Sequence, residues 1–77
     1  MLNNLYDYVI SHRYMDALGE HSIVVKSGIV LGKNMDTAIE QIKSKDKGIV
    51  RSYQAGTIDL YIRPWYSMSE IMKTIFI

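Results

Sequence analysis

The side chains that could carry out chemistry are few, and they are mostly scattered. His12 and Asp16 stand four positions apart, and His21 follows five positions later. In a helix, His12 and Asp16 would lie one turn apart, and imidazole and carboxylate are ligands for zinc and related ions. The sequence supplies none of the outer groups that orient metal ligands. We therefore expect no metal and no cofactor at these residues.

Signals for other kinds of catalysis are also weak. Ser11 and His12 are neighbours, so in a helix they would point about 100° apart, which does not suit a base that activates a hydroxyl. The Gly28–Lys33 stretch ends in Gly-Lys but lacks the spacing of a phosphate-binding loop. The chain has no cysteine, which excludes disulfides and thiolate metal sites. The sequence thus predicts a protein that is not an enzyme.

Residues suited to binding are more concentrated than residues suited to catalysis. Tyrosine, tryptophan and arginine gather in one part of the chain, at Arg51, Tyr53, Tyr61, Arg63, Trp65 and Tyr66. These residue types are enriched in the hot spots of protein–protein interfaces, although ordinary cross-strand packing would use them equally well. Aromatic rings with arginines can also stack on single-stranded nucleic acid, and a basic run at Lys43, Lys45 and Lys47 could assist. Binding to another protein is the preferred prediction, and binding to single-stranded nucleic acid is the alternative.

A β-hairpin over residues 49–66 is expected to position this cluster. Residues 57–63 alternate apolar and polar side chains, which is typical of a strand with one buried face. Residues 49–53 are also strand formers, and a three-residue turn at 54–56 would place Gly56 at positive φ. In that register Arg51 faces Asp59 across the hairpin. Ile58, Leu60 and Ile62 then point to the core, while the aromatic and arginine side chains form the exposed face.

The rest of the chain predicts helices around this hairpin. Apolar residues at three- and four-residue steps indicate a helix over 2–18 that Gly19 ends. Residues 22–31 are either one bent strand with a bulge at Gly28 or a hairpin that turns at Ser27-Gly28. A second helix runs to about Lys45. Asn34 or Asp36 caps this helix, Gly48 ends it, and its buried residues are Met35, Ala38, Ile39 and Ile42.

After the hairpin, Pro64 ends the strand because it has no N–H to donate. Ser67-Met68-Ser69-Glu70 has the spacing of a capping box, so a third helix is expected to run to the end of the chain. The element order is then α-β-α-β-β-α, or α-ββ-α-ββ-α if residues 22–31 fold back. The fold class is α+β: one domain over residues 1–77, with a small antiparallel or mixed sheet of three to four strands and helices packed on one face.

Composition narrows the function further. The chain of 77 residues is 48% hydrophobic and carries a net charge of +1, which does not suit a dedicated binder of duplex DNA. It contains neither an apolar run long enough to span a bilayer nor a signal peptide, so we expect a cytosolic protein. The abundance of isoleucine, tyrosine and lysine resembles the coding bias of AT-rich genomes, including those of phages and other mobile elements. These properties suit an adaptor, an antitoxin-like partner or a phage-type inhibitor of a host protein.

A second copy of the chain is a further expected partner. The last seven residues carry apolar side chains on more than one side of the expected third helix. A chain this short has a thin stability margin, which burial of that surface between two copies would increase. We therefore expect that a homodimer could form through the C-terminal helix.

Overall fold

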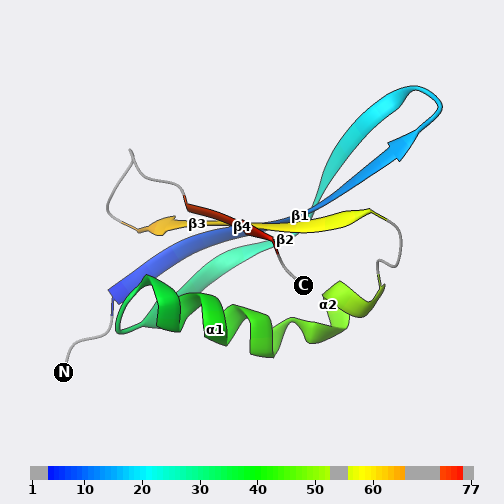
Figure 1. Cartoon of the computed structure of the whole chain (residues 1–77). Helices are drawn as coiled ribbons and strands as arrows, with labels where there is room; N and C mark the ends of the chain where they lie inside the picture. The colour runs from blue at the N-terminus through cyan, green and yellow to red at the C-terminus, as the bar shows by residue number, and fades with distance from the viewer. Residues whose placement is uncertain (1–3, 53–55, 66–71, 76–77) are drawn as a thin grey trace.

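The described residues form a four-stranded antiparallel sheet with a helical segment between its second and third strands (Figure 1). The computed structural model describes residues 4–52, 56–65 and 72–75. The elements, in chain order, are β1 Asn4–Asp16, β2 Gly19–Gly32, α1 Met35–Lys45, α2 Lys47–Ser52, β3 Thr57–Pro64 and β4 Met72–Ile75. Their order across the sheet is β2-β1-β3-β4, so β1 and β3 are the inner strands.

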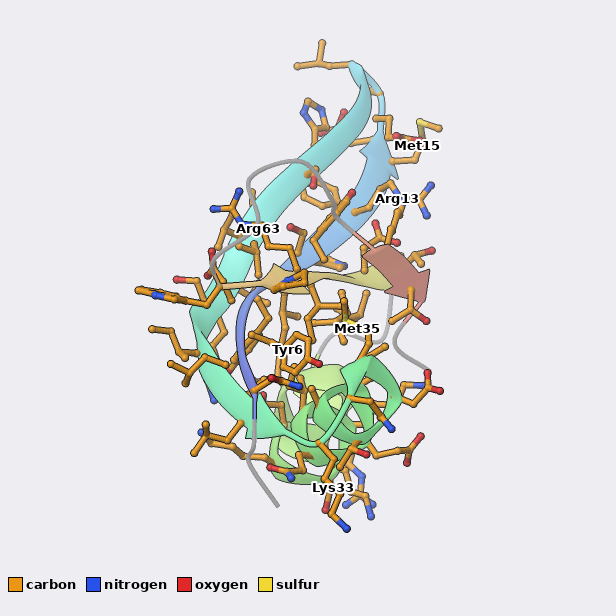
Figure 2. All side chains as sticks on the ribbon, turned by 90° about the vertical axis from the view of Figure 1, so that its left-hand side faces the viewer. Tyr6, Arg13, Met15, Lys33, Met35 and Arg63 are labelled. Atoms are coloured by element: carbon orange, nitrogen blue, oxygen red, sulfur yellow. The ribbon has the colours of Figure 1, made fainter. Side chains whose placement is uncertain are left out.

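The core lies between the sheet and α1, on what we call the core side. Alternate residues of β1 and β3 point to this side, and Figure 2 shows Tyr6 and Met35 between the sheet and the helix. Apolar alternation on two neighbouring strands produces one continuous buried surface. Its buried members are Tyr6, Tyr8, Ile10, Ala38, Ile39, Ile42, Ile58, Leu60 and Ile62.

Helix α1 spans Met35–Lys45, close to the predicted helix, and three of its four predicted core residues, Ala38, Ile39 and Ile42, are buried, whereas Met35 is partly buried. The side chain of Asn34 accepts a hydrogen bond from the Thr37 backbone N–H, which caps the first turn. At the other end, the buried Asp46 carboxylate accepts a hydrogen bond from Lys26 of β2. This bond raises the pKa of Lys26 above the ordinary lysine value. The helix is thus attached to β2 by an ionic contact as well as by apolar packing.

Beyond β3, β1 and β2 continue as a two-stranded hairpin, which we call the arm (residues 14–21). β3 pairs with β1 only up to Arg13, so the arm extends past the rest of the sheet (Figure 1). At its tip the Asp16 carboxylate accepts a hydrogen bond from the Leu18 backbone N–H, and Gly19 adopts a φ of 120°. An Asx turn followed by a glycine is a common way to close a tight hairpin.

The α+β fold class predicted from the sequence is wrong. The described chain is mostly antiparallel strand and contains one helix longer than six residues, not three helices packed on a sheet. The expected helix over 2–18 is instead strand β1. Its apolar residues satisfy a three- to four-residue period and a two-residue period at once, and aromatic and β-branched residues such as Tyr8 and Val9 favour the strand.

Other element predictions also need correction. Residues 49–53 were expected to form a strand, but Lys47–Ser52 is α2, and Gly48 lies inside this helix rather than ending α1. Residues 22–31 belong to one strand, and the extra residue of its bulge is Val25 rather than Gly28. The expected third helix is contradicted at Met72–Ile75, which is a strand, whereas its capping box lies outside the described residues. The predicted strand over 57–63 is confirmed as β3, and Gly56 has a φ of 89°.

Two glycine substitutions test the packing of α1 against the end of β2 and the helical conformation of α2. A Cβ on Gly32 would lie 2.8 Å from the Ala38 backbone nitrogen, whereas a Cβ on Gly48 would meet nothing within 4 Å. We expect Gly32→Ala to lower the free energy of unfolding by about 1–3 kcal/mol through overpacking. Gly48→Ala should raise it by about 0.5–1 kcal/mol, because alanine favours a helix interior. Urea denaturation measures both changes. Destabilisation by Gly48→Ala would instead indicate that Gly48 ends a helix.

Candidate functional site

The side of the sheet away from α1, which we call the open face, carries charged and apolar side chains together. The register of the strands places Asp7 opposite Arg63 and Val9 opposite Tyr61 on this side. Directly opposed residues on antiparallel strands share a face, and their side chains are close enough to interact. The open face is therefore a surface on which residues from all four described strands meet.

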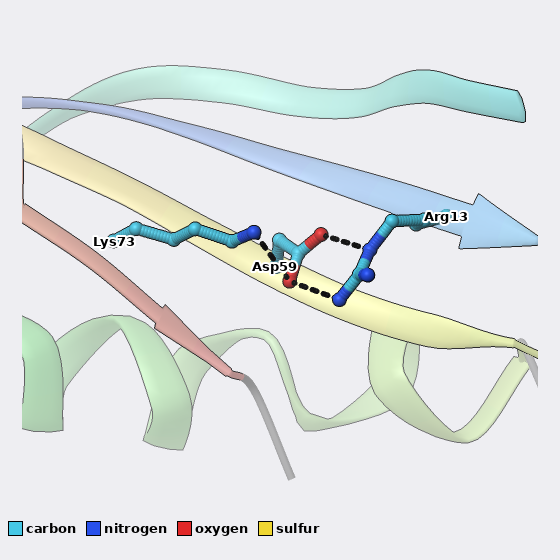
Figure 3. Close-up of polar contacts among 3 residues, drawn as sticks. All are labelled: Arg13, Asp59 and Lys73. Carbon is cyan, nitrogen blue, oxygen red and sulfur yellow. Dashed lines mark hydrogen bonds and ion pairs between the residues drawn. The ribbon is translucent and has the colours of Figure 1, made fainter. Parts of the chain in front are cut away.

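A buried carboxylate lies at its centre. Asp59 of β3 is only 1% exposed, and its oxygens contact Arg13 Nε at 3.0 Å and Lys73 Nζ at 3.7 Å (Figure 3). A second Arg13 nitrogen, Nη2, donates to the other oxygen at 3.4 Å. The hydrogen bond to Asp59 and the negative charge of the Asp59 carboxylate raise the pKa of Arg13 above the ordinary arginine value. This one carboxylate links β1, β3 and β4.

A hollow lies between β1 and β3, beside a second ion pair that Asp7 and Arg63 form. Arg63 Nε donates to Asp7 Oδ2 at 3.2 Å, and Arg63 Nη2 forms an ion pair with the same oxygen at 3.1 Å. The hollow has a volume of about 240 Å³ and is lined by Asp7, Tyr8, Val9, Tyr61, Ile62 and Arg63. The ammonium group of Lys73 lies 5.6 Å from the centre of the Tyr61 ring, within the range of a cation–π contact. The polar side chains around the hollow are therefore held in place by their neighbours.

Apolar side chains surround these ion pairs and remain accessible to solvent. Their exposed fractions run from 40% to 66%, for Leu5, Val24, Ile29, Leu31 and Trp65. The Trp65 backbone N–H donates to the Leu5 carbonyl at 3.0 Å, so pairing with β1 continues one residue past β3. The alternation of the strand then places Trp65 on the same side as Arg63. Exposed apolar side chains grouped around charged ones are a common feature of interaction surfaces.

The structure brings together only part of the predicted binding cluster. Tyr61 and Arg63 lie on the open face and Trp65 follows them, but Arg51 is an exposed residue of α2. Tyr53 and Tyr66 lie outside the described residues. The predicted pairing of Arg51 with Asp59 is wrong, since Asp59 lies opposite Ser11 and its partners are Arg13 and Lys73.

Sequence reasoning missed the contribution of β1 to this face. Asp7, Val9 and Arg13 occupy alternate positions of that strand, with Ser11 between Val9 and Arg13. A two-residue period over residues 5–13 was the available signal, but the helical interpretation of the same residues concealed it. Pairing between β1 and β3 joins residues about fifty positions apart, which no local pattern reveals.

The basic run lies on a different part of the molecule. Lys43 and Lys45 are in the last turn of α1, and Lys47 begins α2. Helix α1 covers the core side, and of these three lysines only Lys45 lies near open-face residues, at the edge of β2. Cations near the end of a helix also complement its dipole, which gives them a structural role.

The residues considered for a metal site lie on the arm and its base. His21 Nε2 contacts Asp16 Oδ1 at 2.8 Å, while the Tyr14 ring lies between His12 and His21, with ring centres 5.3 and 5.4 Å away. Over residues 4–52, 56–65 and 72–75, no three histidine or carboxylate side chains are arranged to hold a metal ion.

Comparisons with known protein families, with curated proteins and with solved structures found no match to this chain. None of the described helices has the length and apolar character needed to cross a membrane.

The central ion pair gives a stability prediction with an internal control. Asp59→Ala leaves Arg13 and Lys73 without their carboxylate, and loss of one partner of a buried pair costs about 3–5 kcal/mol. Arg13 and Lys73 are 33% and 46% exposed and regain water, so we expect about 2 kcal/mol, in the range of hydrogen bonds to a charged group. Asp7→Ala removes a half-buried partner of Arg63 and should cost no more than about 1 kcal/mol. Urea denaturation of both variants makes the comparison, and equal losses would contradict a special role for Asp59.

Proposed function

We propose that this chain is a small, non-enzymatic module that binds another protein through the open face of its sheet. The observation that carries the proposal is the group of half-exposed apolar side chains, including Trp65, around the ordered pair of Asp7 and Arg63. Interface hot spots combine aromatic and arginine residues with surrounding residues that exclude water. The module would serve as an adaptor, an antitoxin-like partner or an inhibitor, and its cytosolic location stays a prediction.

The charges on this face suit a protein partner. Arg63 is already paired with Asp7, and Asp59 is already buried between two cations. A partner that covers the open face removes these charged groups from water. Because each charged group keeps its oppositely charged neighbour, the desolvation cost of binding is lower than for unpaired charges. The hollow beside Val9 and Tyr61 offers a place for an apolar side chain of the partner.

The other candidate functions have less support. Single-stranded nucleic acid was expected to use this face together with Lys43, Lys45 and Lys47, but these lysines lie on α1 and α2, and of the three only Lys45 lies near open-face residues. Three cations and two carboxylates on the face leave little net attraction for phosphates. The homodimer expected through a C-terminal helix loses its basis, because Met72–Ile75 is a strand.

The proposal is tested by finding the partner and then substituting Trp65. Partners captured from a host extract are identified by mass spectrometry, and affinity is measured with the purified partner. Trp65→Ala should weaken binding by about 2 kcal/mol, or roughly 30-fold, as expected for a hot-spot tryptophan. Leu18→Ala is the matched control, since Leu18 is an exposed apolar residue at the tip of the arm. Unchanged affinity of the folded Trp65→Ala variant would refute binding at the open face.

A further inference from the structure

The outer edge of β2 is a second candidate binding surface. In the described chain β2 occupies one end of the strand order, and its ladder is formed with β1 alone. An edge strand presents unpaired backbone N–H and C=O groups along its free side. At 14 residues β2 is long, and it has no proline that would block pairing there.

A groove of about 630 Å³ lies along part of this edge, between β2 and α1. Its lining consists of Leu5, Ile29, Val30, Leu31, Gln41, Ser44 and Lys45. Ile29 and Leu31 are alternate residues of β2, and each is 49% exposed. The groove therefore has a strand edge with accessible apolar side chains on one side and a helix with polar side chains on the other.

We propose that this groove binds an extended, acidic segment of another protein, which adds as a fifth strand to the free edge of β2. Peptide-binding domains use such strand addition, in which backbone hydrogen bonds provide affinity and alternate side chains provide specificity. This binding goes beyond the function proposed above, because it uses the backbone edge of β2 rather than the hollow between β1 and β3. The two surfaces share the side chains of Leu5, Ile29 and Leu31.

The charge of the groove selects the occupant. Lys45 is the one charged residue in its lining, and Lys43 and Lys47 lie within two residues of it. The nearby carboxylate of Asp46 is buried and paired with Lys26, so it does not cancel these charges at the surface. Of the exposed carboxylates of α1, Asp36 lies in the first turn and Glu40 in the middle of the helix, whereas Lys43 and Lys45 lie in the last turn. An occupant with carboxylates opposite the end of α1 is therefore complementary.

A second copy of this chain fits the groove less well. Pairing of two β2 edges would bring the same lysines of both copies to one interface, where like charges oppose association. A segment that alternates apolar and acidic residues neutralises the lysines and covers Ile29 and Leu31 at the same time. The groove thus favours an acidic segment over self-association.

Binding is tested with a pool of fluorescent, capped octapeptides that alternate Glu or Asp with Val, Leu or Ile. Fluorescence anisotropy against the full chain should give a Kd below about 1 mM, and NMR should show shifts of the amides of residues 29–31. Lys45→Glu should weaken binding about fivefold or more. Lys47→Glu is the matched control, because it makes the same charge change outside the groove lining and should have a smaller effect.

Two further probes separate strand addition from simple charge attraction. Peptides with N-methyl groups on alternate residues cannot donate along one edge, so they should bind at least about tenfold more weakly. Equal binding of these peptides, equal effects of the two lysine substitutions, or no binding below about 1 mM would each overturn the proposal. A mass of twice 8.9 kDa by light scattering, with β2 protected in the dimer, would assign the edge to a second copy and would also overturn it. Trp65→Ala should leave peptide binding unchanged, which distinguishes this surface from the open face.

Discussion

The structure depends on the pairing of β1 along both of its edges. This strand joins β2 on one side and β3 on the other, so the positions of both neighbours follow from its register. Its alternate side chains then separate the molecule into a core side and an open face. A one-residue slip would exchange these two sets and would expose Tyr6, Tyr8 and Ile10 to water. Register is therefore the constraint that places both the core and the candidate binding surface.

Asp59 reinforces that register with charge. Because the carboxylate is buried, its contacts with Arg13 and Lys73 fix three strands relative to one another. Replacing such a cluster with apolar residues is often neutral for stability, so we propose that its main role is to specify one arrangement of the strands. The neighbouring Asp7–Arg63 pair is less buried and orders the hollow beside it. On the open face, ordered charged groups are thus surrounded by apolar side chains.

The two proposed surfaces differ in the physics that would drive binding. On the open face, an apolar contact around Trp65 would dominate, since the charged groups there already have partners. On the edge of β2, backbone hydrogen bonds and the lysines at the end of α1 would dominate. The two surfaces overlap at Leu5, Ile29 and Leu31, which are on the open face and also line the groove. One partner could therefore use both, with a folded domain on the face and an extended segment on the edge.

The sequence by itself determined the parts of this protein that local interactions decide. The helical character of α1 and the alternation of residues 57–63 follow from neighbouring residues. The sequence left the cap open between Asn34 and Asp36. It placed Gly56 at positive φ in a hairpin turn, although residues 47–52 form α2 and the backbone of Gly56 lies against the Arg13 carbonyl. Only the tertiary structure decided that residues 4–16 are a strand, because their pattern fits two periods and pairing with β2 and β3 selects one. The same holds for the partners of Asp59, which come from β1 and β4. Long-range pairing also selected α2 over a strand at residues 47–52, since β1 took the place beside β3 that this segment was expected to occupy.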